Sequence, residues 1–404
     1  MRREAENITT EANTTPPASR LPPHPQIAIV AGEASGDLLG SLLIGALNKT
    51  GPACEFFGIA GNRMQAAGAK SLYPMDTLSV RGYVEAFGSV RKILAIRRGL
   101  KRRLLADRPQ LFVGVDAPDF NLALETKLKR AGIPTVHFIS PSIWAWRPKR
   151  IDKIRRAADH VLLIFPFEEA LYRQAGIPAT YVGHPIAHAL PDPDRAATRQ
   201  RLKLPLDAEY VALLPGSRPS ELQALGRLFV ETAKQLHARR PQLSFLVPLV
   251  NLATRQAFDR ALIEADAHDL PIRILFGHAH DALQAADAAL IASGTATLEA
   301  LLLGCPHVIT YKMPGFTYWL MRRQALQPWV GLPNILAQRA VVPEILQDAA
   351  TPKALADALE TLLSDESVRH AQVEEFDIQR ARLRRDTPRL IAQALRPLLE
   401  SRER

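Results

Sequence analysis

The sequence contains little of what would place it in several common classes of protein. Its 404 residues include two cysteines, Cys54 and Cys305, which lie far apart in or beside apolar runs and lack the spacing of metal ligands. We expect both to be core thiols in a reducing compartment, without a disulfide. No run of about 18 apolar residues is present, so no segment is predicted to span a membrane.

Several motifs that would identify a catalytic or targeting class are also missing. The chain has no Walker A sequence, no Gly-x-Ser-x-Gly elbow and no calcium-type acidic loop. His184 and His188 are four residues apart, but Pro185 lies between them and no third ligand is near, so we predict no metal site. Residues 1–25 are polar and proline-rich, without the apolar core of a signal peptide, and we interpret them as a disordered extension.

Basic residues outnumber acidic ones, 51 to 41, which gives a net charge of +10. Such an excess favours nucleic acid, an anionic membrane or anionic substrates as partners. Eight Lys and Arg residues between Arg91 and Arg108 are interleaved with Ile and Leu, the pattern of a basic amphipathic helix. This helix either packs on a core and exposes a solvated face or contacts a membrane surface. Nucleic acid is disfavoured because no basic patch is interleaved with aromatic residues.

Apolar, strand-like runs alternate with helical patterns along the chain, which predicts an α/β fold with parallel sheets. The expected strands are 26–30, 55–59, 111–115, 135–139, 160–164, 180–182, 210–214, 244–247, 272–276, 288–292 and 307–310. A proline-punctuated break at 183–193 divides them, so we predict domains at 26–190 and 191–364 and a helical tail at 365–404. Two doubly wound, Rossmann-like domains would face a central cleft at the carboxyl ends of their strands.

Two loops in the second domain favour binding of a diphosphate. Each lies between an expected strand and a helix, where free backbone N–H groups and a helix dipole attract anions. The first, residues 215–218, supplies Ser217 and Arg218, and the guanidinium can bind phosphate oxygens in bidentate fashion. The second is Ser293-Gly294-Thr295, followed by Glu299, which could accept bonds from sugar hydroxyls. Taken alone, this second stretch could equally be an ordinary turn with a surface Glu.

Residues 32–37, Gly-Glu-Ala-Ser-Gly-Asp, follow the first expected strand. The carboxylates of Glu33 and Asp37 would repel a phosphate, so we predict that this loop, with Ser35 and Gly36, faces a sugar whose hydroxyls suit acceptors. A capping or solvated carboxylate is the alternative for Asp37.

Residues 113–121 are predicted to form a strand that ends in two carboxylates. Asp116 is expected at the carboxyl end of the strand, where α/β folds place ligands, and Pro118 stiffens the turn. A carboxylate held there can take a proton from an alcohol, so Asp116 is the candidate general base. Asp119 falls where a helix begins, and we interpret it as an N-cap. The choice of base between the two carboxylates stays open.

Three further segments carry candidate contacts. In residues 140–147 the rings of Trp144 and Trp146 suit stacking or an acyl-chain wall, and buried packing is the equal alternative. Asn334, in Gly-Leu-Pro-Asn, offers both a donor and an acceptor. The apolar run 316–321, which precedes two arginines, is either core or the acyl-chain or membrane side of the cleft.

Six motifs in this chain resemble, in order, those of lipid-A-disaccharide synthases. They are GEASGD at 32–37, DAPDFN at 116–121, SPSIWAW at 140–146, PGSR at 215–218, SGT at 293–295 with Glu299, and LPN at 332–334. The resemblance spans roughly residues 25–363 and implies a two-domain GT-B glycosyltransferase. It implies transfer of 2,3-diacylglucosamine from its UDP derivative to 2,3-diacylglucosamine 1-phosphate (lipid X), with inversion, no cofactor and release of UDP.

The resemblance also implies roles for the candidate residues, with Asp116 deprotonating the acceptor 6-hydroxyl. The acceptor side would comprise Glu33, Ser35, Gly36, Asp37, Asn121, Ser140 and Trp144. The UDP side would comprise Ser217, Arg218, Ser293, Gly294, Thr295, Glu299 and Asn334. The expected location is the cytoplasmic face of a Gram-negative inner membrane, on an anionic surface, and homo-oligomerisation stays open. The rival hypotheses are another UDP-N-acetylglucosamine enzyme of the same fold, namely a peptidoglycan-type transferase or a 2-epimerase, and a catalytically silent membrane-associated binding protein.

Overall fold

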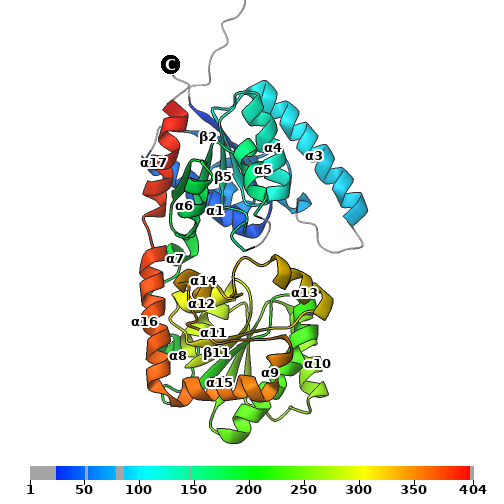
Figure 1. The fold of residues 1–404 in the computed structure, drawn as a ribbon, viewed down its shortest axis with the longest axis vertical. Helices are drawn as coiled ribbons and strands as arrows, with labels where there is room; N and C mark the ends of the chain where they lie inside the picture. Colours follow the sequence, from blue (N-terminus) through cyan, green and yellow to red (C-terminus); the bar gives the residue numbers. More distant parts are fainter. Residues whose placement is uncertain (1–23, 51–52, 79–85, 146–147, 401–404) are drawn as a thin grey trace, which may run out of the picture.

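The computed structural model describes residues 24–50, 53–78, 86–145 and 148–400. They form two α/β domains stacked along the long axis of the molecule (Figure 1). The expected extension, 1–25, lies almost entirely outside the described residues. No helix in the described ranges is long and apolar enough to cross a bilayer.

The N-terminal domain is built on a seven-stranded parallel sheet with the order β3-β2-β1-β4-β5-β6-β7. Its strands are Gln26–Ala31 (β1), Glu55–Ile59 (β2), Ala69–Ser71 (β3), Leu111–Val115 (β4), Thr135–Phe138 (β5), His160–Leu163 (β6) and Ala179–Tyr181 (β7). Its helices are Ala34–Thr50 (α1), Asn62–Ala66 (α2), the 3-10 turn Met75–Thr77 (η1), Ala86–Asp107 (α3), Pro118–Arg130 (α4), Arg150–Ala157 (α5), Glu168–Gln174 (α6) and Pro185–Ala189 (α7). Alternate residues of β1 enter different cores, Ile27 and Ile29 on one face and Ala28 and Val30 on the other. The strand is therefore a continuous apolar run.

The C-terminal domain repeats this plan on a six-stranded parallel sheet with the order β10-β9-β8-β11-β12-β13. Its strands are Tyr210–Leu214 (β8), Ser244–Leu249 (β9), Ile272–Phe276 (β10), Ala288–Ala292 (β11), His307–Tyr311 (β12) and Glu344–Leu346 (β13). The helices up to residue 364 are Arg195–Arg201 (α8), Pro219–Arg239 (α9), Leu252–Glu264 (α10), Ala279–Ala285 (α11), Ala296–Leu302 (α12), Gly315–Gln324 (α13), Leu332–Ala337 (α14), the 3-10 turn Gln347–Ala349 (η2) and Pro352–Ser364 (α15). In Figure 1, α12, α13 and α14 lie on the side that faces the N-terminal domain.

The predicted α/β class and every predicted strand are confirmed, with ends that agree within two residues. The strands β3 and β13 were not expected from the sequence. Each has three residues and lies at the edge of its sheet, where a strand is too short to show a hydrophobic alternation.

The predicted helical tail contains Glu366–Leu383 (α16) and Thr387–Glu400 (α17), and it links the two domains. Figure 1 shows α16 along the C-terminal domain and α17 along the N-terminal domain. Arg380 Nε donates to the carbonyl of Leu302 in α12 at 2.8 Å, which fixes α16 to the C-terminal domain. Tyr181 Oη, at the end of β7, donates to the carbonyl of Arg382 at 2.7 Å. The tail is thus part of both domains and not an appendage of one.

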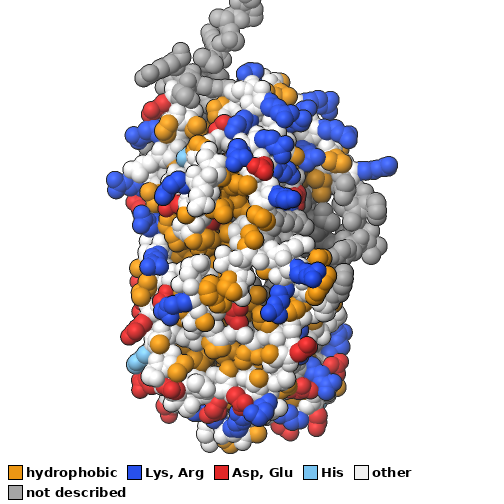
Figure 2. Space-filling model, viewed as in Figure 1, with side chains coloured by type: hydrophobic (Ala, Val, Ile, Leu, Met, Phe, Trp, Pro, Cys, Tyr) orange, Lys and Arg blue, Asp and Glu red, His pale blue; other side chains and the backbone are white. Residues whose placement is uncertain are grey.

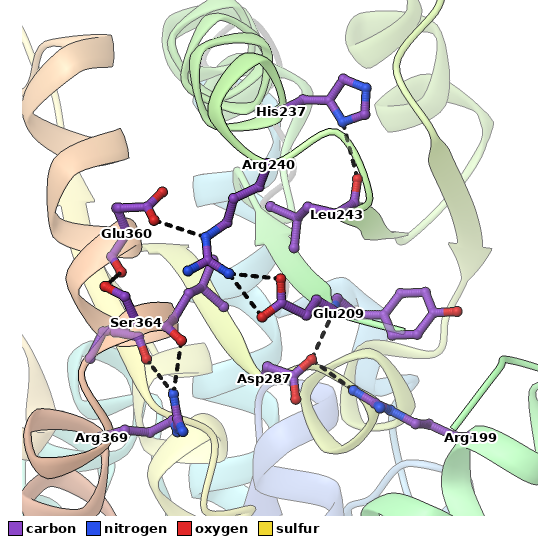
Figure 3. Close-up of polar contacts among 12 residues, drawn as sticks. Arg199, Glu209, His237, Arg240, Leu243, Asp287, Glu360, Ser364 and Arg369 are labelled. Atoms are coloured by element: carbon purple, nitrogen blue, oxygen red, sulfur yellow. Dashed lines mark hydrogen bonds and ion pairs between the residues drawn. The ribbon is translucent and has the colours of Figure 1, made fainter. Parts of the chain in front are cut away.

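A polar network stabilises the second sheet at the amino ends of its strands (Figure 3). Asp287, just before β11, accepts hydrogen bonds from Arg199 Nη2 at 2.8 Å and from the backbone N–H of Tyr210 at 2.9 Å. Arg240 donates to both carboxylate oxygens of Glu209 and to Glu360 of α15. The network joins elements that are distant in sequence, and it lies at the opposite end of the strands from the predicted ligand loops.

Candidate functional site

The carboxyl end of β4 carries a strained turn that holds Asp116. Asp116 and Ala117 both have left-handed backbones, with φ of 52° and 43°. The Asp116 N–H donates to the carbonyl of Phe138 at 2.9 Å, and Asn121 Nδ2 donates to the Asp116 carbonyl at 2.8 Å. Left-handed non-glycine residues cost free energy and gather at active sites. The turn leaves the Asp116 side chain half-buried at the end of the strand.

Asp119 is not the N-cap that we predicted from the sequence. The N-cap of α4 is Ala117, and Pro118 takes the first helical position, which places Asp119 within the first turn. The Asp119 carboxylate is 80% exposed and pairs with Arg150 Nη2 at 3.0 Å. Its contribution to the helix is therefore the favourable interaction of an acid with the helix dipole.

In the loop after β1, Asp37 caps a helix, which is the alternative that we gave for this residue. Asp37 is buried, and its two carboxylate oxygens accept from the backbone N–H groups of Arg63 at 2.9 Å and Met64 at 3.0 Å, in the first turn of α2. Gly36 is also buried, and a Cβ there would make ordinary van der Waals contacts, at 3.4 Å from both the Val115 carbonyl oxygen and Ala31 Cβ. Glu33 and Ser35 are exposed and remain available to a ligand.

Three other acceptor-side candidates lie wholly or partly in the interior. Asn121 is fully buried behind the Asp116 turn. Ser140 is buried and its hydroxyl lies 2.7 Å from Tyr172 Oη. The half-buried Trp144 packs edge-on against Phe167, with ring centroids 5.2 Å apart. Trp146 and Arg147 lie outside the described residues.

The first predicted diphosphate loop already binds a carboxylate of its own chain. The backbone N–H groups of Ser217 and Arg218 donate to Glu221 Oε2 at 2.8 and 3.2 Å. The Arg218 guanidinium is 76% exposed and lies 3.1 Å from Glu221 Oε1. The loop is thus arranged for an anion, and a phosphate at these N–H groups would displace Glu221.

The second predicted loop follows β11 and is open on one side. The Ser293 hydroxyl donates to the carbonyl of Val330 at 3.3 Å, and a Cβ on Gly294 would contact nothing within 4 Å. Thr295 is the N-cap of α12. Glu299 pairs with His280 Nε2 of α11 at 3.2 Å, and this carboxylate raises the pKa of His280. We did not predict His280, because no motif surrounds it.

Asn334 has a structural role in this fold. It is buried, and its Oδ1 accepts from the N–H groups of Val341 and Val342 at 2.7 and 2.8 Å. Its Nδ2 donates to the Val342 carbonyl and to Glu344 Oε1, both at 2.8 Å. The amide therefore has no hydrogen-bonding capacity left for a nucleotide, and it supports the loop that precedes β13.

Basic side chains gather on the N-terminal domain (Figure 2), and apolar side chains are exposed on α13 of the C-terminal domain near the junction. Leu100 and Leu104 of α3 are buried, whereas its described Lys and Arg residues are largely exposed, so α3 is a core-packed helix with a basic face. Lys and Arg gather over this part of the molecule (Figure 2). On α13, Trp319 and Met321 are about half exposed, and the Arg323 guanidinium lies 4.2 Å from the Trp319 ring centroid. The N–H of Leu326, just after α13, donates to the carbonyl of Ala145 in the N-terminal domain.

The histidine pair has no arrangement suited to a metal. His184 is buried, its Nδ1 accepts from the N–H of Ile186, and burial lowers its pKa to about 4. Across the described ranges, no three His, Cys, Asp or Glu side chains gather closely enough to hold a metal ion. The two cysteines lie in different domains, and Cys305 is buried whereas Cys54 is half-buried.

Two parallel-sheet domains with polar loops at the carboxyl ends of their strands define a GT-B fold, the architecture of a large class of glycosyltransferases. The structure of CalG4, the calicheamicin glycosyltransferase, has a TM-score of 0.57 at 15% identity and covers 94% of this chain and 99% of its own. The UDP-GlcNAc 2-epimerase of Neisseria meningitidis has a TM-score of 0.58 at 11% identity and covers 93% and 98%. At these identities the likeness shows the fold alone.

The chain belongs to the lipid-A-disaccharide synthetase family, whose model matches residues 27–395. The lipid-A-disaccharide synthase of Aromatoleum aromaticum is 54% identical over 375 residues, which is 93% of this chain and 96% of that protein. The resemblance carried by the six sequence motifs is therefore confirmed.

Proposed function

We propose that this enzyme forms the lipid A disaccharide. It transfers 2,3-diacylglucosamine from its UDP derivative to 2,3-diacylglucosamine 1-phosphate, giving the β-1,6-linked tetraacyl disaccharide 1-phosphate and UDP. The observation that carries the proposal is the strained Asp116 turn at the carboxyl end of β4, in a chain of this family. Such a turn presents a carboxylate on the side of the sheet where α/β domains bind ligands.

The N-terminal domain takes the acceptor, and Asp116 is the general base. The carboxylate removes the proton of the acceptor 6-hydroxyl while that oxygen attacks the anomeric carbon of the donor from the face opposite UDP. The new glycosidic bond forms as the bond to the diphosphate breaks, so the configuration inverts. Glu33 and Ser35 are the acceptor contacts that the fold leaves exposed, and Gly32, next to Glu33, lies against Ala117 of this turn.

The C-terminal domain takes UDP. Ser217 and Arg218 contact the diphosphate together with the open loop Gly294–Thr295, and Glu299 accepts from the ribose hydroxyls. The exposed Arg218 guanidinium moves from Glu221 to the phosphate oxygens and stabilises the charge that develops on UDP. This assignment is supported by the carboxylate already bound at the Ser217 and Arg218 N–H groups.

The enzyme works at the cytoplasmic face of the inner membrane as a peripheral protein. Its substrates are anionic and acylated, so a binding surface needs both positive charge and apolar contact. The basic face of α3 supplies the charge, and the exposed Trp319 and Met321 of α13 supply apolar surface beside arginines. Attraction to an anionic bilayer would hold the domain junction close to the membrane surface, so that the acyl chains of the substrates can enter the site between the domains.

The test is incubation of the purified chain with the diacylated UDP-sugar and lipid X, with UDP release and the disaccharide product measured. Formation of both supports the proposal. Turnover of non-acylated UDP-N-acetylglucosamine instead would favour a peptidoglycan-type transferase or a 2-epimerase. Binding of UDP without release from any sugar would indicate a silent binding protein.

A further inference from the structure

A buried polar cluster lies directly behind the Asp116 turn, and the reaction described above does not use it. It consists of Asn121 and Glu125, one turn apart on α4, and His137 in β5. All three side chains are fully buried. Burial of a carboxyl, an amide and an imidazole costs free energy unless the groups are hydrogen-bonded, so their contacts define what the cluster does.

The cluster ties the Asp116 turn to the centre of the sheet. Asn121 Nδ2 donates to the Asp116 carbonyl at 2.8 Å, and it also lies 3.3 Å from the carbonyl of Val30 at the end of β1. His137 Nδ1 lies 2.7 Å from Glu125 Oε1. Asn121 of α4 thus contacts the strained residue Asp116, and Glu125 of the same helix is held in place by His137 of β5.

Gly114 provides the space for this arrangement. It is the β4 residue paired with His137 across the sheet. A Cβ on Gly114 would lie 2.1 Å from Glu125 Oε1 and 3.0 Å from Asn121 Cγ, so both side chains lie against the same backbone position. Any larger residue there would displace them.

The remaining polar atoms of the cluster indicate its protonation. In the part of the chain that the structure describes, Asn121 Oδ1, Glu125 Oε2 and His137 Nε2 have no hydrogen-bond partner. An ionised Glu125 would leave two buried oxygen acceptors of the cluster, its own Oε2 and Asn121 Oδ1, without a donor, whereas a neutral carboxylic acid supplies one. Burial raises the pKa of Glu125 more than its interaction with His137 lowers it, and this net rise in pKa favours the neutral carboxyl.

We propose that Asn121, Glu125 and His137 are positioning residues for Asp116, and that Glu125 is a neutral acid whose proton is donated to Asn121 Oδ1. His137 Nδ1–H then donates to Glu125 Oε1, and both amide hydrogens of Asn121 stay directed at backbone carbonyls. The cluster holds the left-handed backbone of Asp116 from behind and so sets the direction of its carboxylate. The inference rests on the proposed function, because it concerns the base of that reaction.

The experiment compares turnover by Glu125→Gln and Glu125→Ala in the full-length enzyme, with the diacylated UDP-sugar and lipid X as substrates. The Gln amide can donate to Asn121 and accept from His137, so kcat should stay within about threefold of wild type. The Ala variant leaves Asn121 Oδ1 without a donor, and kcat should fall about 10–100-fold because the base is misplaced, with KM for the UDP-sugar little changed. Leu128→Ala, buried on the same helix, is the control that lowers the melting temperature but leaves kcat unchanged.

Infrared difference spectra of wild type minus Glu125→Gln at neutral pH give a second readout, which holds even if Glu125→Ala does not fold. A protonated carboxyl band that disappears with the substitution is expected. Its absence from wild type would overturn the neutral acid, and so would a kcat of Glu125→Gln as low as that of Glu125→Ala. Wild-type kcat in Glu125→Ala would overturn the positioning role. Inactive wild-type enzyme would instead refute the proposed function itself.

Discussion

Replacement of Asp116 by Asn should remove the proposed general base and leave the turn intact. Asparagine has the size of aspartate and, like it, is tolerated in the left-handed region, so the backbone with φ of 52° should persist. Loss of a general base costs about 10²–10⁴-fold in turnover, or roughly 3–5 kcal/mol of activation free energy. Asp116→Ala would be a poorer probe, because alanine adds about 1–2 kcal/mol of backbone strain at the same position.

The assay is UDP release from the diacylated UDP-sugar in the presence of lipid X, with calorimetric titration of UDP into each variant. We expect UDP affinity to be unchanged in Asp116→Asn, because the proposed UDP site lies in the other domain. The melting temperature should also stay close to that of wild type, since Asn121 contacts the Asp116 backbone and not its side chain.

Asp119→Asn is the matched control, three residues away on the same turn. Its carboxylate is largely exposed and pairs with Arg150 at the surface, so turnover should change less than tenfold, about the effect of one exposed ion pair. Near-normal turnover in Asp116→Asn would refute the assignment of the base. A large loss in Asp119→Asn combined with an active Asp116→Asn would transfer the role to Asp119.

Four further substitutions or conditions test other parts of the structure. Arg218→Ala should weaken UDP binding about 10–100-fold, the value of a charge-assisted hydrogen bond, measured by calorimetry. Asp287→Ala leaves the buried Arg199 guanidinium without its carboxylate and should lower the free energy of unfolding in urea by about 3 kcal/mol. The ion pair of His280 with Glu299 requires a protonated imidazole, so it is fully formed below the ordinary pKa of about 6.5 and lost as pH rises through the raised pKa. The melting temperature difference between wild type and His280→Gln should therefore shrink as the pH rises above about 6.5. Binding to anionic vesicles should fall as salt is raised, measured by co-sedimentation.

Matched variants define what would contradict these expectations. Arg227→Ala, at an exposed arginine on the helix that follows the proposed UDP loop, should leave UDP affinity unchanged, and equal affinities in both variants would remove Arg218 from the site. Asp357→Ala breaks two ion pairs between exposed side chains, with Arg239 and Lys353, and should destabilise far less than Asp287→Ala. A pH-independent difference at His280 would mean that its pair with Glu299 is not formed in solution. Salt-independent vesicle binding would indicate apolar insertion.

Much of the fold could be predicted from the sequence because buried parallel strands are continuous apolar runs. β1 and β4 have cores on both faces, which makes them visible without any partner, whereas the three-residue edge strands β3 and β13 carry no such pattern. The position of Asp116 was also predictable, since a polar residue that follows an apolar strand lies at the carboxyl end of that strand. Its left-handed backbone was not, because it depends on the Phe138 carbonyl and on Asn121.

The role of each remaining polar residue was decided by tertiary structure, because a side chain's partners depend on what folds against it. The sequence places a carboxylate at position 37, but only the packing of α2 against it uses both oxygens for capping. Asn334 lies in a family motif, yet the loop that folds around it takes all its hydrogen bonds. Glu125 and His137 lie twelve residues apart on a helix and a strand, and they meet only because Gly114 leaves room between them. Residue types and their order thus determined the fold and the reaction class, and the fold determined which of those residues can touch a substrate.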